Sequence, residues 1–351
     1  MNSATKKSTL IALGEFFGDS LNYYEDKSYV IVNGDLREFV ITAAELVDSV
    51  HSENGWFTRD SVIFVYRAWV NALEKGKVEK WLSNYSLERN DNSKVGVIMA
   101  GNLPMVGLHD ALSVIVSGNV LHAKLSSKDR SLMMLILNVI QKLIPNPEQV
   151  QIVEQLKDVE SLIATGSDNS ARYFDYYFKD KKRIIRKNRT SIAVLEGNES
   201  EEELKGLSHD IFRHFGLGCR NVTKLYLPKG YDLDHVFKAL FHYQEIANHN
   251  KYANNYDYNK AVYLLNKIKL IENGFLLMKE DEGIHSPVGA LFYEFYETLD
   301  DVKRIIENRK DELQCVVSKA ALPQRVSFGM AQSPELWDYA DGIDTIDFLL
   351  N

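Results

Sequence analysis

The amino-acid sequence predicts an α/β protein built on a parallel, doubly wound sheet. Short β-rich runs alternate with stretches of helical periodicity between Lys94 and Gly197, and such alternation is typical of parallel sheets with crossover helices. The chain has 351 residues, of which 45% are apolar and 26% charged, so it is long enough to divide a large core between two domains.

The predicted elements follow one another in a regular order. Residues 1–93 mix aromatic and charged residues, and 60–85 have the apolar spacing of an amphipathic helix. The expected strands lie within 94–102, 119–126, 150–155, 161–166, 182–188 and 191–197. The expected helices between them lie within 105–118, 131–144 and 167–178. Ligands of parallel sheets bind beyond the carboxyl ends of the strands, so the loops after the strands are the informative ones.

Three of these loops carry polar residues suited to a ligand. Asn102 stands where the first strand runs into a helix, so its amide fits either a donor to a developing anion or a plain helix cap. Lys124 ends the second strand. Its ammonium group either binds a ribose or phosphate of a ligand or is a solvated surface charge. Gly166 and Ser167 precede a helix, which fits both an N-cap and a phosphate-facing helix start. The sequence has no GxGxxG at this loop, so the ordinary dinucleotide fingerprint is missing.

The overall composition narrows the class of protein. The formal charge is −8 and no long Lys/Arg block occurs, so a nucleic-acid partner is not expected. No uncharged run is long enough to span a bilayer, and the N-terminal apolar run is broken by Glu15. Two cysteines far apart in sequence argue against a disulfide framework and favour the cytoplasm. No metal site is expected.

The two cysteines occupy different kinds of segment. Cys315 lies in an apolar run typical of a buried strand. Cys219 lies in a glycine-containing loop, "RHFGLGCRNV", which a substrate carbonyl can approach closely. The neighbouring Arg213, His214 and Arg220 would lower the pKa of its thiol and so favour the nucleophilic thiolate. From the local sequence, Cys219 is either a nucleophile or an inert loop thiol.

Taken together, the stretches "AGNLPMVGLHDALSVIVSGNVLHAKLSS", "ATGSDNSAR" and "FGLGCRNV" resemble the successive motifs of the aldehyde dehydrogenase superfamily. Those motifs are a proline-tryptophan-asparagine-phenylalanine-proline turn, an alanine-glycine-asparagine then lysine-proline-serine strand, a glycine-serine turn and a glycine-glutamine-x-cysteine loop. The residues that match are Asn102, Pro104, Gly118, Asn119, Lys124, Ser126, Gly166, Ser167, Gly216 and Cys219.

The chain also departs from these motifs. Ala100 and Gly101 replace the proline and tryptophan, Leu125 the proline after the lysine, and Leu217 the glutamine. Hydrolytic members carry a water-activating glutamate in a glutamate-leucine-glycine-glycine turn. Alignment with "AVLEGNES" places Leu195 at that position. Loss of the base points away from hydrolysis and towards the LuxC-type acyl-CoA reductases, which residues 94–351 resemble.

The resemblance implies an aldehyde-dehydrogenase-like fold, with a Rossmann-type cofactor domain and an α/β catalytic domain that carries the cysteine. The implied division is 1–93 as a helical or mixed segment packing on the cofactor domain, 94–198 as the dinucleotide-binding domain, 199–335 as the catalytic domain and 336–351 as a strand-like tail. Terminal strands of the superfamily often pair across subunits, so a homo-oligomer is expected.

The implied reaction is the NADPH-dependent reduction of an acyl-CoA, or another acyl-pantetheine thioester, to the aldehyde through acyl-Cys219. Asn102 and the Cys219 backbone N–H would hold the oxyanion. Lys124, Ser126, Gly166 and Ser167 would bind the cofactor, and NADH is not excluded. The open alternatives are a CoA-acylating aldehyde dehydrogenase, a cysteine acyltransferase without redox chemistry, and a non-catalytic binding protein.

Three further features are noted without an assigned function. His109 and His214 are either proton-transfer groups or structural residues. The stretch "KYANNYDYNK", residues 251–260, is either the lining of a polar pocket in the second domain or a hydrogen-bonded loop, and the loop is the preferred interpretation.

Overall fold

The computed structural model describes residues 1–88, 92–166 and 168–351. The chain divides into two compact units, which are described separately. The first contains residues 1–187 and 335–351, and the second contains 188–334. The sequence division placed its boundary after residue 198. The second unit begins earlier because residues 190–194 pair with strands of the second sheet.

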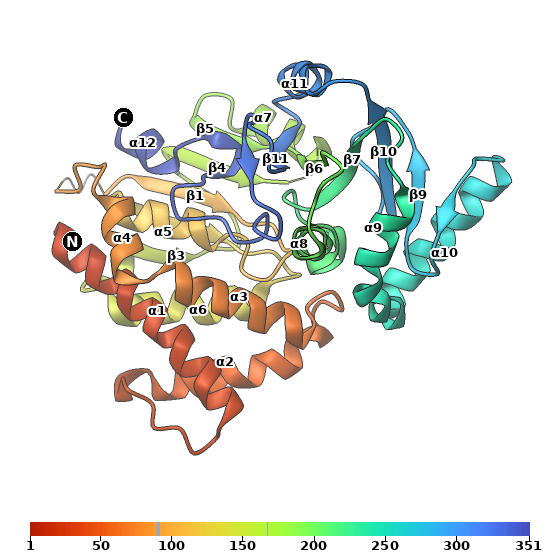
Figure 1. Cartoon of the computed structure of the whole chain (residues 1–351). Coiled ribbons are helices and arrows are strands. Elements are labelled where there is room, and N and C mark those ends of the chain that lie inside the picture. The colour runs from red at the N-terminus through yellow and green to blue at the C-terminus, as the bar shows by residue number, and fades with distance from the viewer. Residues whose placement is uncertain (89–91, 167) are drawn as a thin grey trace. The chain divides into compact units, whose positions relative to one another are not determined.

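The first unit is built on a five-stranded sheet in the order β3-β2-β1-β4-β5 (Figure 1). All of its strand pairs are parallel, which confirms the predicted doubly wound sheet. Its strands are β1 (Lys94–Ile98), β2 (Val120–Lys124), β3 (Val150–Ile152), β4 (Ser161–Thr165) and β5 (Lys182–Arg186). The strand order runs from β1 through β2 to β3 on one side and from β4 to β5 on the other. The switch point, where sheets of this kind bind ligands, therefore lies between β1 and β4.

Helices cover this sheet. They are α1 (Ser3–Glu25), α2 (Arg37–Ser49), α3 (Arg59–Ala72), α4 (Lys75–Leu82), α5 (Leu108–Val116), α6 (Arg130–Leu143), α7 (Asp168–Tyr177) and α12 (Thr345–Leu350), with short 3-10 turns η1 (Gly34–Leu36), η2 (Val50–Ser52), η3 (Pro147–Gln149) and η6 (Ala340–Gly342). α6 packs against α1 and α2, and α12 packs against α5. One continuous apolar core joins the N-terminal helices to the sheet.

The C-terminal tail corrects an expectation from the sequence. Residues 345–350 form the helix α12, not a strand. The side chain of Asp344 accepts the N–H of Asp347 at 2.9 Å and so caps the helix. Ile346 is fully buried on one face. The tail therefore gives no support for strand pairing between subunits.

The second unit is a seven-stranded sheet in the order β12-β11-β6-β7-β10-β9-β8. Its strands are β6 (Thr190–Val194), β7 (Val222–Pro228), β8 (Ile271–Glu272), β9 (Leu277–Glu280), β10 (Ala290–Tyr296), β11 (Leu313–Val317) and β12 (Arg325–Val326). The helical elements are α8 (Glu201–Phe212), η4 (Arg213–Gly216), α9 (Leu233–Leu240), η5 (Phe241–Asn248), α10 (Asn250–Leu265) and α11 (Leu299–Asn308). Only β8 runs antiparallel to its neighbour among the described strands.

Helix α10 replaces the loop that was expected over residues 251–260. Tyr252, Tyr256 and Asn259 are its buried residues, and their i, i+4, i+7 spacing places them on one face. The hydroxyl of Tyr252 donates to the carbonyl of Phe275 at 3.0 Å. These tyrosine and asparagine side chains can be buried on a helix because their polar atoms form hydrogen bonds inside the unit.

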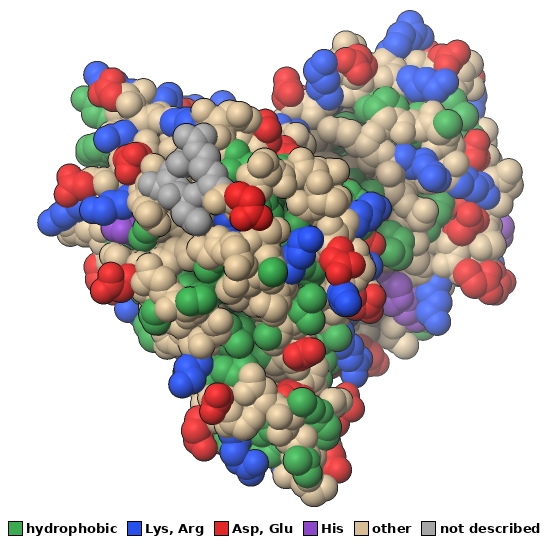
Figure 2. Space-filling model, turned by 90° about the vertical axis from the view of Figure 1, so that its left-hand side faces the viewer, with side chains coloured by type: hydrophobic (Ala, Val, Ile, Leu, Met, Phe, Trp, Pro, Cys, Tyr) green, Lys and Arg blue, Asp and Glu red, His purple; other side chains and the backbone are tan. Residues whose placement is uncertain are grey.

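Three broad properties of the described residues bear on the class of protein. No helix among them combines the length and the hydropathy needed to cross a bilayer. Lysine and arginine side chains are interspersed with aspartate and glutamate over the face shown in Figure 2. No group of three His, Cys, Asp or Glu residues in the described ranges could hold a metal ion.

Candidate active site

Cys219 lies in the loop between α8 and β7, and its side chain is exposed. The hydroxyl of Ser191, in β6, donates to the carbonyl of Cys219 at 3.0 Å. The same hydroxyl lies 3.1 Å from the sulfur of Cys315, which is buried in β11 as predicted. Neither cysteine forms a disulfide. The loop therefore presents an exposed thiol at the amino-terminal edge of the central strands.

The backbone before Cys219 is strained. His214, Phe215 and Gly216 have φ angles of 52°, 60° and 77°, so three consecutive residues adopt the left-handed conformation. Only glycine adopts it readily, and each of the others costs on the order of 1 kcal/mol. Such strain persists only where the surrounding structure holds it, and it is concentrated at functional sites.

Asn221 supplies part of that support, and the sequence analysis missed it. Its side-chain oxygen accepts the N–H of Gly218 at 2.8 Å. Its amide nitrogen lies within hydrogen-bonding distance of the carbonyls of Asp210, Ile211 and Arg213, at 3.1, 3.1 and 2.8 Å. The side chain is fully buried. It ties the end of α8 to the residue before the thiol, so it fixes the loop from inside.

A second tie joins the Cys219 loop to residues 329–331. The carboxylate of Asp210 accepts the N–H groups of Gly329 and Ala331 at 2.7 and 2.9 Å. Arg220, the residue after the thiol, donates from Nε to the carbonyl of Ala331 at 2.6 Å. Burial raises the pKa of Asp210 to about 7, against the opposing effect of the two backbone N–H groups. Cys219 is therefore held from both flanking residues.

His214 does not supply the cation that the sequence suggested. Burial, followed by the repulsion of Arg213, lowers the pKa of His214 to about 4. The imidazole is neutral at physiological pH, so it cannot stabilise a thiolate by its charge. His109 has structural contacts: it is partly buried, its Nε2 lies 2.8 Å from the carbonyl of Leu336, and its ring packs between Trp81 and Tyr339.

The alignment of "AVLEGNES" with the water-activating turn is wrong in three dimensions. Leu195 is fully buried just beyond the carboxyl end of β6. Ser191, which contacts the Cys219 loop, lies near the amino end of the same strand. At ~3.3 Å per residue the two positions are about 13 Å apart. Neither Leu195 nor Glu196 therefore occupies the position of a base for Cys219.

In the first unit, two of the predicted loops pack tightly together. Asn102 is exposed in the loop that follows β1. A Cβ atom on the preceding Gly101 would lie 2.4 Å from Oγ of Ser126, in the loop after β2, so only glycine fits there. Ser126 accepts the N–H of Lys128 at 3.2 Å. Lys124, at the end of β2, donates from Nζ to the carbonyl of Glu154 at 3.3 Å.

The third predicted loop follows β4. A Cβ atom on Gly166 would lie 2.9 Å from Cβ of Ser170, in the first turn of α7, so glycine lets the chain fold tightly into this helix. Ser167 lies outside the described residues. β4 is the direct neighbour of β1, so Gly166 and Asn102 follow the two strands at the switch point.

Two residues of the N-terminal segment support these loops, and the sequence gave no sign of them. The amide of Asn54 donates to the carbonyl of Gly101 at 3.1 Å and to that of Lys128 at 3.3 Å. The carboxylate of Glu53 accepts the N–H groups of Arg130 and Ser131 at the start of α6. The anion-binding end of α6 is thus filled by Glu53.

Asp129 joins the same two loops. Its side chain is fully buried, and Oδ2 accepts the N–H of Met105 at 2.7 Å. Oδ1 receives no hydrogen bond from any described residue. Burial raises the pKa of Asp129 to about 8, opposed by the Met105 N–H and reinforced by the charge of Glu53. The carboxyl group is therefore mostly protonated at neutral pH.

We expect Asp129→Asn to stabilise the protein at alkaline pH. Between pH ~4 and ~8 the unfolded chain releases the Asp129 proton and the folded chain retains it, so wild-type stability falls as pH rises. The asparagine amide does not titrate, so the variant does not lose this stability as the pH rises. The gain in Tm of the variant over wild type should be near zero at pH 4 and about 10–20 °C at pH 8.5, because a pKa raised to about 8 corresponds to on the order of 5 kcal/mol.

Thermal unfolding followed by circular dichroism at both pH values measures this difference. Asp48→Asn is the matched control, because Asp48 is half-exposed and its ion pair with Arg59 is on the surface. A gain in Tm for Asp129→Asn that does not grow with pH would show that Asp129 is ionised in the folded protein.

The two units and the exposed cysteine define an α/β protein of the aldehyde dehydrogenase fold. Among solved structures, the chain is similar to aldehyde dehydrogenase 21 from Physcomitrella patens, with TM-score 0.68, 12% identity, and coverage of 100% of this chain and 84% of that one. It is similar to an NAD-dependent aldehyde dehydrogenase from Sinorhizobium meliloti, with TM-score 0.62, 12% identity and coverage of 92% and 71%. It is also similar to aldehyde dehydrogenase C from Pseudomonas syringae, with TM-score 0.61, 12% identity and coverage of 94% and 74%.

No protein-family model matches the chain, and no curated protein matches it. The structural similarity therefore establishes the fold alone.

Proposed function

We propose that the chain is a nicotinamide-dependent oxidoreductase of the aldehyde dehydrogenase type, with Cys219 as its nucleophile. The observation that carries the proposal is the exposed thiol at the end of a strained, firmly tied loop in this fold. The structural neighbours include enzymes described as NAD-dependent, and one described in complex with NAD+ and octanal. They support a nicotinamide cofactor and a carbonyl substrate for this chain.

The first unit has residues that fit such a cofactor. The loops after β1 and β2 are packed together at Gly101, and Gly166 keeps the approach to α7 free of a side chain. Lys124 would face the adenosine ribose or a 2′-phosphate, which favours NADPH, while Ser126, Gly166 and Ser167 would lie towards the remaining phosphates and sugar. When bound, the reduced cofactor supplies a hydride.

We further propose that the substrate is an acyl thioester, such as acyl-CoA, which is reduced to the aldehyde. The Cys219 thiolate attacks the thioester carbon, and the Cys219 N–H would stabilise the oxyanion. The resemblance to the superfamily motifs assigns the second oxyanion donor to the Asn102 amide. The C–S bond to CoA breaks, CoA leaves as the thiol after taking up a proton, and acyl-Cys219 remains. The acyl carbon then accepts a hydride, and collapse of the thiohemiacetal breaks its bond to sulfur and releases the aldehyde.

The placement of Glu196 supports reduction over hydrolysis. This carboxylate lies just past the carboxyl end of β6, away from the Cys219 loop. The carboxylate that is tied to the loop, that of Asp210, accepts backbone N–H groups with both oxygens. Neither of these two carboxylates is therefore placed to activate water at Cys219, and an acyl-cysteine that no base attacks through water would survive long enough to accept a hydride.

Absorbance at the reduced-nicotinamide band tests this function. NADPH and NADH are each mixed with the protein and a panel of acyl-CoA esters, and aldehydes with CoA and the oxidised cofactors test the reverse direction. Oxidation of NADPH that depends on the ester is the expected result. Acylation of Cys219 detected by mass spectrometry without any cofactor turnover would replace the proposal with an acyltransferase. Absence of both signals would leave a binding protein.

A further inference from the structure

Cys219 stands in a tight turn that is closed at both ends. The N–H of Asn221 donates to the carbonyl of Gly218 at 3.0 Å, which makes Cys219 and Arg220 the two central residues of a β-turn. The side chain of Asn221 accepts the N–H of Gly218 at 2.8 Å in return. Because a peptide group is planar and trans, the held carbonyl of Gly218 also sets the direction of the Cys219 N–H, which points the opposite way.

The peptide group on the other side of Cys219 is held by Ser191. The hydroxyl of Ser191 donates to the Cys219 carbonyl at 3.0 Å, and the Ser191 N–H donates to the carbonyl of Asn221 at 3.2 Å. A residue has only two soft backbone dihedrals, so φ and ψ of Cys219 are set once the peptide groups on both of its sides are held. These dihedrals decide where the thiol and the N–H of Cys219 point.

Ser191 is itself anchored from its other side. Its side chain is fully buried, and its oxygen accepts the N–H of Cys315 in β11 at 3.2 Å. The sulfur of Cys315 lies 3.1 Å from the same oxygen. A thiol sulfur is a weaker acceptor than a carbonyl oxygen, so the single hydrogen of the hydroxyl is directed to the Cys219 carbonyl.

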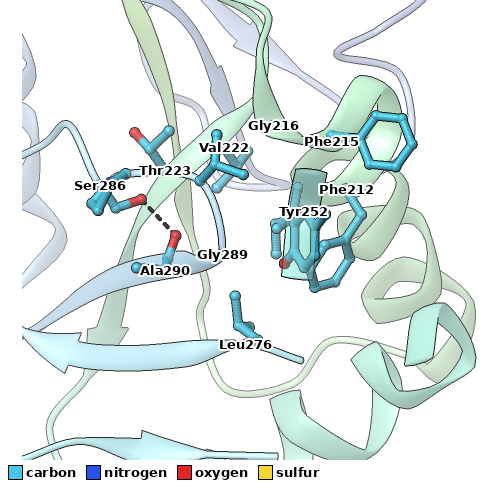
Figure 3. A pocket seen from close by; sticks show the side chains of 13 residues that line it. Phe212, Phe215, Gly216, Val222, Thr223, Tyr252, Leu276, Ser286, Gly289 and Ala290 are labelled. Carbon is cyan, nitrogen blue, oxygen red and sulfur yellow. Dashed lines mark hydrogen bonds between the residues drawn. The ribbon is translucent and has the colours of Figure 1, made fainter. Parts of the chain in front are cut away.

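The strand pairing is irregular on both sides of Ser191. The register of β6 shifts against β11 and against β7, and each neighbour has one residue more than β6 at this point. In β7 the extra residue is Thr223, whose hydroxyl lies 2.5 Å from that of Thr190. Figure 3 shows Thr223 and Val222, the first residues of β7, in the small hollow that Gly216 also lines. Bulges are rare between parallel strands and frequent beside active sites, where they redirect a side chain.

We propose that Ser191 is a positioning residue for the reaction at Cys219. Its hydroxyl holds the Cys219 carbonyl, and so keeps the thiol and the N–H of Cys219 directed at one substrate carbonyl. The inference rests on the proposed function, in which the sulfur attacks the carbonyl carbon and the N–H stabilises the oxyanion. Both groups belong to one residue, so a change in its φ or ψ misplaces them together, and a misplacement of about 1 Å costs on the order of 10²-fold in rate.

Ser191→Ala tests this inference, since it removes the donor to the Cys219 carbonyl. The kcat of acyl-dependent NADPH oxidation should fall by ~10–100-fold. The KM for the ester should stay within about two-fold of wild type, because the buried hydroxyl contacts the loop and not the substrate. The rate of Cys219 acylation without cofactor, followed by mass spectrometry of quenched samples, should fall as much as kcat. Ser191→Thr keeps the hydroxyl on a residue suited to a strand, and should recover most of kcat.

Ser318→Ala is the matched control. Ser318 is equally buried in the same unit, where its hydroxyl donates to the carbonyl of Val194 at 2.8 Å and accepts the N–H of Ala320 at 3.1 Å. The control therefore loses one buried donor and one buried acceptor, as Ser191→Ala does, but at the carboxyl end of β6. It should lower Tm by a similar amount, and it should leave kcat and the acylation rate within about two-fold of wild type.

The outcomes separate this inference from the proposed function. Wild-type acylation and kcat in Ser191→Ala overturn the inference, and so does an equal loss of kcat in Ser318→Ala. If Ser191→Ala does not fold, Ser191→Cys, which keeps the volume and weakens the donor, is judged by the same two rates. If wild type itself is neither acylated nor able to oxidise NADPH, the proposed function fails, and this inference fails with it.

Discussion

Replacement of Cys219 by alanine should abolish acyl-dependent NADPH oxidation, with kcat/KM falling by ~10⁴-fold or more. The sulfur is the atom that accepts the acyl group, and the described structure shows no second nucleophile on this loop. Because the side chain is exposed, its loss leaves no buried cavity. The fold, as measured by circular dichroism and Tm, should be unchanged.

Cys315→Ala is the matched control for this experiment. Cys315 is only 2% exposed, in β11, so the variant should lose some stability to a small cavity and retain its activity. Retained turnover in Cys219→Ala, or equal loss of turnover in both variants, would remove Cys219 from the mechanism.

Asn102→Ala should lower kcat by about 10²–10³-fold, the usual effect of losing one oxyanion donor. The exposed position of Asn102 after β1 means that the variant should keep the wild-type Tm. The Kd for the cofactor, measured by quenching of tryptophan fluorescence, should also be unchanged, because the proposed donor acts on the substrate oxygen.

Asn119→Ala is the matched control, because it removes a different asparagine side chain from the same unit. Its side chain is buried and donates to the hydroxyl of Ser117 at 2.9 Å, so the variant should lose stability and keep kcat within a few-fold of wild type. The helix-cap alternative from the local sequence is wrong, since α5 begins at Leu108 and its N-cap is Gly107. If Asn102→Ala loses stability in place of kcat, Asn102 is a structural residue of the loop after β1.

The secondary structure of the first unit was largely predictable from the sequence, since its strands are short apolar runs with crossover helices between them. Errors arose where a local pattern had two interpretations. The tail at 345–350 alternates apolar and acidic residues in a way that fits a strand, but capping by Asp344 and burial of Ile346 make it a helix. Residues 251–260 likewise form a helix because the tyrosine hydroxyls find partners only in the folded unit.

The supporting residues of the candidate site could not be predicted. Asn221, Glu53 and Asn54 are ordinary polar residues in the sequence, and each acts on backbone groups that tertiary structure brings within reach. The opposite error occurred at Leu195, where alignment on a single glycine placed this residue at the motif's glutamate, although it stands at the wrong end of β6. A motif match in sequence does not show at which end of a strand the matched residues lie, and so it does not show which loop they are close to.

The sequence by itself determined the fold class, the glycine loop that carries Cys219 and the buried place of Cys315, because periodicity and residue type act locally. Only the tertiary structure decided the neutral state of His214, the protonation of Asp129 and the ties that Asn221 makes to the Cys219 loop. These depend on desolvation and on contacts between distant segments, and neither is specified by the neighbours of a residue along the chain.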